Sequence, residues 1–236
     1  MNDLIHLKKS LNNKKTKMDI AANLQSIKST LPQNVTLVAV SKTKPILDLM
    51  KAYNAGQRIF GENKIQEMSE KWEQMPKDIQ WHMIGHVQTN KVKYMASFVS
   101  LIHGVDSLKL LQEINKQALK NNRIIDCLLQ MHIAEEETKF GLDEEELAKL
   151  LASNDFLEMK NIRIVGLMGM ATFTDNQNQI KKEFIHLNSI FKGLQSHKDS
   201  LPQVSILSMG MSGDYKLAIE CGSTMVRIGS SIFGGR

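Results

Sequence analysis

The chain has 236 residues, of which 42% are hydrophobic and 23% charged. This apolar content excludes a mostly disordered chain, and no apolar run approaches the ~20 residues that a membrane-spanning helix needs. The formal net charge of +5 is mildly basic and is compatible with phosphate-bearing ligands. Cys127 and Cys221 lie far apart and form no CxxC pair, which argues against a disulfide scaffold or a zinc ribbon and favours the reducing cytoplasm.

The first 30 residues read as an N-terminal helical segment. Leucine and isoleucine recur in it at helical spacing, at Leu4, Leu7, Leu11, Ile20, Leu24 and Ile27. Five lysines fall within residues 8–17, but no aromatic residue is interleaved among them. We therefore interpret this stretch as a solvated helix face or terminus, and we expect no nucleic-acid partner. No apolar run here is long enough for a signal peptide, so we expect a cytoplasmic protein with no membrane partner.

After residue 35, short apolar runs alternate with longer amphipathic stretches. We predict eight strands, at 36–40, 58–60, 80–84, 98–102, 124–132, 163–168, 204–207 and 225–228. Helices are predicted between them, at 62–74, 107–121, 143–153, 178–195 and 213–221, with Pro45 and Asp143 placed as helix starts would require.

Eight strands alternating with helices indicate parallel βα units. Strands covered on both faces explain the continuous apolar runs. The count favours an α/β fold of the (β/α)8, or TIM barrel, type over a doubly wound open sheet, because that sheet normally has fewer strands and no GxGxxG follows the first strand. We see no linker or repeat, and we predict one barrel domain over residues 1–236, with 1–30 as its N-terminal helical segment.

Lys42 is the first candidate for chemistry, because it follows the strand at 36–40 on the same face as Val38 and Val40. In a TIM barrel the functional groups follow the carboxyl ends of the strands. A partly desolvated lysine there would have a lowered pKa and could attack carbonyls to form a Schiff base. The alternative is an ordinary solvated lysine beyond a strand. Lys44 has the same parity but lies further into the loop beside Pro45.

Two late loops favour an anion. The segments 208–214 and 229–231 are rich in glycine and serine, and they follow the seventh and eighth strands, where phosphate sites of these barrels usually lie. A helix starting near Gly213 could also point its N-terminus at the anion. Ordinary turn glycines are the alternative. A phosphate beside an amine nucleophile suggests pyridoxal 5′-phosphate or a phosphosugar aldolase.

Arg227 lies inside the apolar strand at 225–228, where a guanidinium needs a partner. It could form a buried ion pair with a carboxylate. It could instead face the pyridine nitrogen of a cofactor, keep that nitrogen unprotonated and so weaken the ring as an electron sink.

From about Val35 to Arg236 the sequence resembles the pyridoxal phosphate homeostasis proteins, which look like the barrel domain of alanine racemase. The matching stretches are Leu37-Val-Ala-Val-Ser-Lys-Thr-Lys-Pro45, Phe60-Gly-Glu-Asn63, Trp81-His-Met-Ile-Gly-His86, Gln88-Thr-Asn-Lys91, Lys139-Phe-Gly-Leu142, Gly166-Leu-Met168, Leu207-Ser-Met-Gly-Met-Ser212 with Asp214, Gly222-Ser-Thr-Met-Val-Arg-Ile-Gly229 and Ile232-Phe-Gly234. They keep their order and span nearly the whole chain.

The resemblance implies a site for pyridoxal 5′-phosphate, held as an internal aldimine on Lys42. It implies that Arg227 faces the ring nitrogen, that Asn63 lines the pocket and that His86 lies near it. It also implies that the phosphate is lined by Ser208, Met209, Gly229 and Ser230.

The resemblance leaves a carrier and an enzyme as alternatives. A racemase needs an acid–base group on each face of its substrate, and alanine racemase takes its second one, a tyrosine, from a further domain that we expect to be missing here. The tyrosines Tyr53, Tyr94 and Tyr215 fall on or near predicted helices, although His86 or His132 could stand in. We favour a monomeric protein of intracellular cofactor homeostasis, with cofactor-dependent apoenzymes as acceptors, over an amino-acid racemase. A phosphosugar lyase is a third alternative. His82 and His86 are four residues apart but lack an HExxH context, so we expect no metal site.

Overall fold

The computed structural model describes residues 19–136, 140–196, 201 and 203–235. Most of the predicted N-terminal helical segment, including its five lysines, lies outside the described residues. The part that is described forms helix α2 (Ile20–Thr30), whose first turn is capped by the carboxylate of Asp19.

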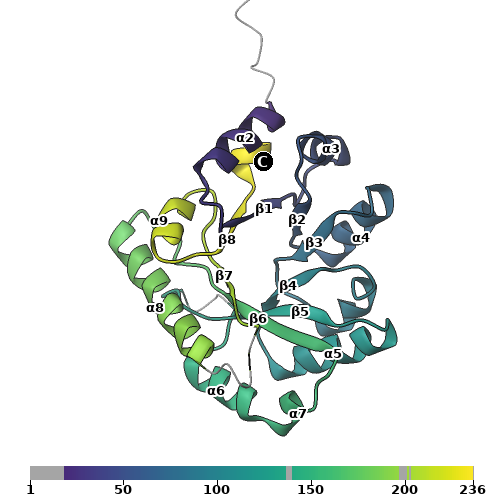
Figure 1. The fold of residues 1–236 in the computed structure, drawn as a ribbon, viewed down its shortest axis with the longest axis vertical. Helices are drawn as coiled ribbons and strands as arrows, with labels where there is room; N and C mark the ends of the chain where they lie inside the picture. Colours follow the sequence, from purple (N-terminus) through teal and green to yellow (C-terminus); the bar gives the residue numbers. More distant parts are fainter. Residues whose placement is uncertain (1–18, 137–139, 197–200, 202, 236) are drawn as a thin grey trace, which may run out of the picture.

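Eight parallel strands close into a barrel in sequence order, so the predicted (β/α)8 fold is confirmed and the open doubly wound sheet is excluded. Figure 1 shows the strands around a common centre with the helices outside them. The strands are β1 (Thr36–Val40), β2 (Ile59–Glu62), β3 (Gln80–Met83), β4 (Leu101–Val105), β5 (Ile125–Gln130), β6 (Ile162–Met168), β7 (Ile206–Ser208) and β8 (Met225–Ile228). Strand β8 pairs with β1, with Arg227 opposite Val38, and this pairing closes the ring.

Helices follow most of the strands. They are α3 (Ile46–Asn54), α4 (Ile65–Gln74), the 3-10 helix η1 (Thr89–Tyr94), α5 (Leu108–Lys120), α6 (Glu144–Ala152), α7 (Asn154–Leu157), α8 (Gln177–Ser196), α9 (Tyr215–Glu220) and α10 (Ser230–Phe233). Asp143 forms a capping box with Glu146 at the start of α6, as its predicted position requires. None of the described helices is long and apolar enough to cross a membrane.

The fourth strand lies three residues later than its predicted position at 98–102. The backbone amides of Phe98 and Val99 both donate to the carbonyl of Met95, so these residues close the turn after η1 and cannot join the sheet. Their β-propensity is overridden by this local turn. The shift brings His103 into β4, although the predicted strand ended one residue before it.

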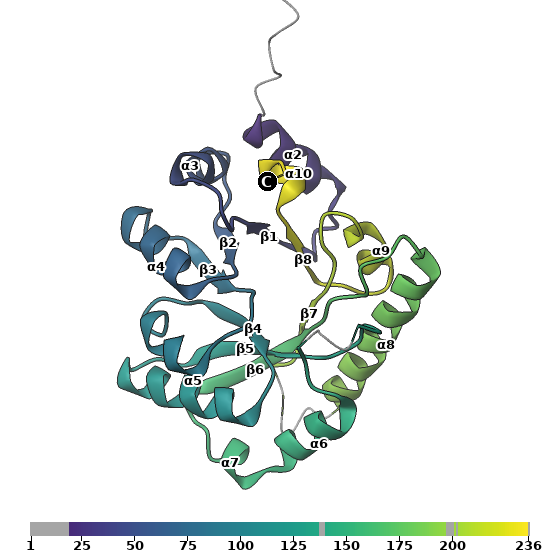
Figure 2. The ribbon, with the colours of Figure 1, turned by 180° about the vertical axis from the view of Figure 1, so that it is seen from behind.

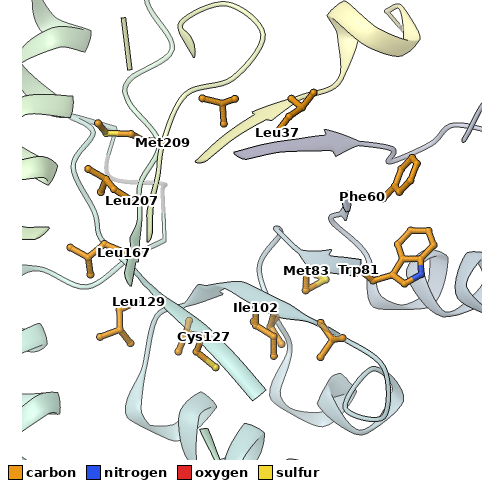
Figure 3. Close-up of a cluster of buried hydrophobic side chains, with 14 of the residues drawn as sticks. Leu37, Phe60, Trp81, Met83, Ile102, Cys127, Leu129, Leu167, Leu207 and Met209 are labelled. Carbon is orange, nitrogen blue, oxygen red and sulfur yellow. The ribbon is translucent and has the colours of Figure 1, made fainter. Parts of the chain in front are cut away.

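The apolar side chains form two layers because successive strand residues point to opposite faces of the sheet. The smaller cluster fills the barrel interior and consists of Val38, Leu101, Leu128, Val165, Met168 and Met225. The larger cluster lies between the strands and the surrounding helices, and Figure 3 shows strand residues of this cluster, such as Leu37, Trp81 and Leu207, pointing away from the barrel centre.

Helix α2 lies beside α10 in both views of the ribbon (Figures 1 and 2), and the side-chain amide of Asn23 donates to the carbonyl of Ile232 at 3.1 Å. Ile20, Leu24 and Ile27 of α2 are buried. The N-terminal helix thus packs beside the segment that follows β8, which carries one of the two predicted phosphate loops.

Candidate functional site

A cavity of about 540 Å³ opens at the carboxyl ends of the strands. Its walls come from β1, β5 and β8 and from the segments that follow β1, β2, β3, β5, β6, β7 and β8, so residues far apart in sequence meet there. Six of the eight predicted site residues line it, namely Lys42, Asn63, His86, Arg227, Gly229 and Ser230. This is the end of the barrel at which enzymes of this fold place their functional groups.

Lys42 is half-buried in the cavity wall, two residues beyond Val40, which also lines the cavity. Val38 belongs to the interior cluster, so the inward parity that the sequence predicted for Lys42 is confirmed. Its Nζ makes no hydrogen bond or ion pair with any residue that the structure describes. Lys44, the second candidate, donates its Nζ to the carbonyl of Gly235 at 2.8 Å. Of these two lysines, Lys42 therefore has the free amine.

A buried charged cluster lies behind Lys42 and consists of Glu62, Glu67 and Lys71. The Nζ of Lys71 donates to Glu62 Oε1 and Glu67 Oε1, both at 2.7 Å, and its side chain is 6% exposed. Burial raises the pKa of Glu62 from its ordinary value, although Lys71 and the Ser41 hydroxyl oppose the shift. No sequence pattern singles out Lys71, because a lysine on an amphipathic helix is normally solvated.

The charged cluster holds both neighbours of Lys42. Lys71 Nζ donates to the Ser41 carbonyl at 2.8 Å, and the Ser41 hydroxyl donates to Glu62 Oε1 at 2.6 Å. On the other side, the Thr43 amide donates to Glu67 Oε1 at 2.6 Å. Thr43 has a φ of 62°, which is unfavourable for a β-branched residue and is sustained by these surrounding bonds. The backbone on both sides of Lys42 is therefore held by charged side chains that lie outside the cavity wall.

Arg227 lies across the cavity floor and is 4% exposed. Its Nη1 donates to the Ser208 carbonyl at 2.9 Å and to Ser208 Oγ at 2.7 Å, and its Nη2 donates to the Gly169 carbonyl at 3.1 Å. Burial lowers its pKa to about 10, against the opposing charge of Asp214. No carboxylate forms an ion pair with it among the described residues, so the buried ion pair considered from the sequence is not its arrangement here.

Three of the five N–H groups of Arg227 are used by these bonds. The other two, on Nε and Nη2, have no partner in the described part of the chain. Since Arg227 lines the cavity, an acceptor atom of a ligand can satisfy them. This is a fixed, electropositive donor on the cavity floor.

Ser208 and Met209, both predicted to line a phosphate, are fully buried and are not part of the cavity wall. The Met209 side chain belongs to the outer apolar cluster, as Figure 3 shows, and its amide donates to the Met225 carbonyl at 3.2 Å. Ser208 points into the barrel and contacts the Arg227 guanidinium. The sequence placed both residues in one glycine-rich loop, but Ser208 is the last residue of β7.

The loop residues that do line the cavity come slightly later, at Ser212 and Gly213 after β7 and at Gly229 and Ser230 after β8. The amides of Ser212, Gly213 and Ser230 have no acceptor among the residues described. The Gly229 amide donates to Ser212 Oγ at 3.3 Å and so joins the two loops. Gly210, with φ of 96°, makes the turn that leads into the first loop. Unpaired amides and hydroxyls gathered in this way suit an anion. The helix expected near Gly213 begins at Tyr215.

Two polar histidines beneath the cavity were not anticipated as parts of the site. His103 on β4 places Nδ1 3.1 Å from Ser208 Oγ and Nε2 3.0 Å from His82 Nδ1. Burial lowers the pKa of His82 to about 3, and burial together with the nearby His82 and Arg227 lowers that of His103 well below its ordinary value. Both rings are therefore neutral near pH 7. His103 was missed because the predicted fourth strand ended at residue 102.

The outer wall of the cavity is largely apolar and includes Phe140, Met170, Phe173 and Met211. None of them was named from the sequence as a site residue, although Met211 lies in the predicted anion segment 208–214. The His86 ring stacks on Phe140 with centroids 4.0 Å apart, and its Nδ1 lies 3.2 Å from the Asp106 carboxylate.

Asn63 contributes a polar atom to the inner wall. Its Oδ1 is buried and has no hydrogen-bond partner, which marks it as an acceptor for a donor on a ligand.

Other candidates from the sequence lie elsewhere. Tyr53, Tyr94 and Tyr215 are all described, and none of them lines the cavity. His132 places its Nε2 3.0 Å from the Glu136 carbonyl and is not part of the wall either. Across the described residues, no group of three or more histidine, cysteine or acidic side chains could hold a metal ion.

Comparison with known proteins places this geometry in a family. Residues 17–236 match the family model "Alanine racemase, N-terminal domain". A pyridoxal phosphate homeostasis protein from Aquifex aeolicus is 41% identical over 85% of this chain and 86% of its own length, and one from Escherichia coli is 34% identical over 92% and 97%. The chain belongs to the pyridoxal phosphate homeostasis protein family.

Solved structures agree with this assignment. PipY of Synechococcus elongatus PCC7942 is 34% identical and superimposes with a TM-score of 0.86 without PLP and 0.83 with PLP bound, over 91% of this chain and 100% of PipY. Alanine racemase from Bartonella henselae, at 18% identity and a TM-score of 0.68, shares the fold with this homeostasis-family chain, which covers 58% of that enzyme.

Proposed function

We propose that this protein binds pyridoxal 5′-phosphate in the cavity and stores and delivers it as part of cofactor homeostasis. The names of the relatives and the PLP-bound PipY structure support the cofactor. The observation that carries the proposal is the meeting of three complementary groups in one cavity. These are the free amine of Lys42, the two unpaired donors of Arg227 and the unpaired amides of the loops after β7 and β8.

The residues fit the cofactor group by group. Bound pyridoxal phosphate supplies an aldehyde with which a lysine amine condenses, with loss of water. Lys42 presents the amine in the partly water-excluded wall, and its backbone is held by the charged cluster. Arg227 offers a free donor to the ring nitrogen. Because the guanidinium stays protonated, the ring nitrogen beside it can act only as an acceptor.

The phosphate would lie at the loops after β7 and β8. Ser212, Gly213 and Ser230 offer amides there, and Gly229 with Ser230 forms the second wall, as the resemblance implied for these two residues. Asn63 Oδ1 is the remaining unpaired acceptor on the inner wall. We propose no direct phosphate contact for the Met209 side chain, which points to the outer cluster.

We favour a carrier over an amino-acid racemase. Racemisation needs acid–base groups on both faces of the substrate. Lys42 supplies one of these groups. No tyrosine lines the cavity. Among the described residues His86 is the histidine in the cavity wall, and its ring is stacked on Phe140 and lies within hydrogen-bond distance of Asp106. We further propose a monomer in the cytoplasm with cofactor-dependent apoenzymes as acceptors.

The first experiment is an absorption spectrum of the protein with added pyridoxal phosphate, followed by borohydride reduction and peptide mass analysis. We expect a visible band and a pyridoxyl group on Lys42. Lys42→Ala should lose both, while Lys51→Ala, a surface substitution on α3, should keep both. A colourless wild-type protein that stays unmodified after reduction would contradict the proposal.

A second experiment separates carrier from enzyme. Loaded protein is incubated with single amino acids, and the enantiomer ratio is followed by chiral chromatography. We expect no turnover, but transfer of the cofactor to an added apoenzyme at a rate above its release to a small-molecule trap. Reproducible racemisation that disappears in Lys42→Ala would favour the enzyme.

A further inference from the structure

Four buried polar side chains form a chain of hydrogen bonds across the barrel interior, directly beneath the cavity. We call Arg227, Ser208, His103 and His82 the histidine chain. Its links are 2.7 Å from Arg227 Nη1 to Ser208 Oγ, 3.1 Å from Ser208 Oγ to His103 Nδ1 and 3.0 Å from His103 Nε2 to His82 Nδ1. All four residues are at most 4% exposed. The links join β8, β7, β4 and β3.

The first link determines the direction of the whole chain. A guanidinium can only donate, so Ser208 Oγ must accept from Arg227. The single hydroxyl proton of Ser208 is then free to go to His103 Nδ1. This nitrogen must carry a lone pair, so the neutral ring of His103 holds its proton on Nε2. That proton is donated to His82 Nδ1, and His82 in turn holds its proton on Nε2.

The reverse arrangement leaves a group unsatisfied. If His103 carried its proton on Nδ1, Ser208 Oγ would accept twice and its own proton would have no acceptor among the described residues. A doubly protonated His103 would have the same defect and would add a second cation close to Arg227. Burial and these charges already favour the neutral ring. In the first direction every link has one donor and one acceptor, and the only ring proton without a described acceptor is the Nε2–H of His82, which is 4% exposed. The reverse direction leaves the proton of the fully buried Ser208 hydroxyl without an acceptor, which is more costly.

The histidine chain binds Arg227 on the side of the guanidinium that points away from the cavity. Nη1 is held by Ser208, and Nη2 is held by the carbonyl of Gly169, the residue that follows β6. The unpaired donors, on Nε and Nη2, are left for the cavity. A Ser208 hydroxyl that could rotate freely would also offer its proton towards Arg227, which repels it. His103 prevents this by accepting that proton.

We propose that His103 is a positioning residue, which fixes the Ser208 hydroxyl as an acceptor and thereby orients the free donors of Arg227 towards a heteroaromatic nitrogen acceptor of the ligand. The direction of hydrogen-bond donation along the histidine chain does not depend on the ligand. The effect on ligand affinity rests on the proposed function.

The direction is tested on the wild-type protein without any cofactor. Nitrogen-15 NMR of the histidine side chains reports which ring nitrogen carries the proton. We expect both His82 and His103 as Nε2–H tautomers, with no titration between pH 8 and pH 5.5. An Nδ1–H tautomer for His103, or its protonation within this range, would overturn the proposal whether or not the protein takes up pyridoxal phosphate.

The positioning role is tested with matched variants of His103. His103→Leu removes the acceptor and should weaken capture of pyridoxal phosphate roughly tenfold, the usual effect of losing one buried hydrogen bond. His103→Gln can accept from Ser208 with Oε1 and donate to His82 with Nε2, so it should stay within about threefold of the wild type. Unchanged affinity in His103→Leu would contradict the role.

Leu101→Val serves as the packing control, because Leu101 lies two residues earlier on the same face of β4, in the smaller apolar cluster. It stands opposite His82 in the sheet, but its side chain takes part in none of the hydrogen bonds of the histidine chain. The substitution should lower the free energy of unfolding without changing ligand affinity. Equal losses of affinity in Leu101→Val and His103→Leu would indicate a merely structural role. If His103→Leu does not fold, the affinity of His103→Gln and the wild-type NMR spectrum still decide the matter. A wild type that binds no pyridoxal phosphate but has both expected tautomers would refute the proposed function alone.

Discussion

Two buried polar groups support opposite sides of the same cavity, and they do so with different chemistry. Behind Lys42, the charged cluster joins one ammonium to two carboxylates. Beneath the cavity, the Arg227 guanidinium donates only to neutral acceptors, the Ser208 hydroxyl and the carbonyls of Ser208 and Gly169, and the histidine chain continues from that hydroxyl to the His103 imidazole. Both bury a cation, but only the first neutralises it.

The difference follows from what each side must offer a ligand. Arg227 needs its charge to remain available in the cavity, and a carboxylate beside it would take up the donors that a ring nitrogen could use. Lys71 never reaches the cavity, so its charge can be fully paired. Pairing it fixes the backbone on both sides of Lys42 without placing a carboxylate on the Lys42 amine. A buried cation is thus structural where it is paired with acids and available for binding where its partners are neutral.

The largest expected effect comes from breaking the charged cluster. Lys71→Met leaves the buried Glu62 and the partly buried Glu67 without a counter-ion, and we expect the free energy of unfolding to fall by about 3–5 kcal/mol. Urea denaturation measures it. Lys51→Met breaks the exposed pair with Asp48, whose side chains are 53% and 27% exposed, and should cost less than about 1 kcal/mol. Equal costs for the two variants would show that the buried pairing is not stabilising.

For the histidine chain, we expect the free energy of unfolding to fall as the pH is lowered. The pKa of His82 is lowered by burial to about 3 from an ordinary 6.5, so at pH 5 the unfolded chain binds a proton there that the folded chain does not. Stability from this group is therefore complete above pH 6.5 and falls as the pH drops, by about 2 kcal/mol at pH 5.

The matched measurement is urea denaturation at pH 7.5 and pH 5. His82→Gln keeps an acceptor for His103 but cannot titrate, so it should lose about 2 kcal/mol less than the wild type between the two values. His186→Gln, a substitution of a half-exposed histidine on α8, is the control and should behave like the wild type. An unchanged pH dependence in His82→Gln would argue against a neutral, buried His82.

A smaller effect is expected when one acid of the charged cluster loses its charge but not its shape. Glu67→Gln still offers an oxygen to the Thr43 amide and to Lys71, although these bonds are no longer charge-assisted. The expected cost is about 1 kcal/mol by urea denaturation. If Glu67→Gln lowered the free energy of unfolding as much as Lys71→Met, the cluster would be stabilised by its hydrogen-bond geometry and not by its charges.

The smallest effect, and the only gain, is expected at Thr43. Its φ of 62° is strained for threonine, and glycine removes that strain while adding freedom to the unfolded chain. Thr43→Gly should change the free energy of unfolding by less than about 1 kcal/mol, in the stabilising direction. Its rate of pyridoxal phosphate capture should still fall, because the backbone beside Lys42 becomes less restricted. Faster capture would contradict a positioning role for this segment.

The sequence was most informative where the position of a site residue depends on one strand alone. The inward parity of Lys42 follows from the alternation along β1, and the isolation of Arg227 in an apolar strand marks it as special. Both line the cavity, as do Gly229 and Ser230 of the loop predicted after the eighth strand, and Asn63 and His86, which the family resemblance implied. Ser208 and Met209 do not, because β7 continues through Ser208 and alternation then points Met209 outwards, whereas the sequence showed only a glycine-rich loop.

By itself, the sequence determined the order of strands and helices, the barrel they form and the amine and guanidinium at the ends of β1 and β8. These depend on local periodicity and on the fixed geometry of parallel βα units. Only the tertiary structure decided the partners of Lys71 and His103. Lys71 reads as a solvated helix lysine and His103 as a residue beyond a strand, until packing removes both from water. Lys71 also pairs with Glu67 four residues earlier on α4, which is a local helical spacing. Its bonds to Glu62 and Ser41, and those of His103 to Ser208 and His82, join separate strands and loops, and no local pattern in the chain records them.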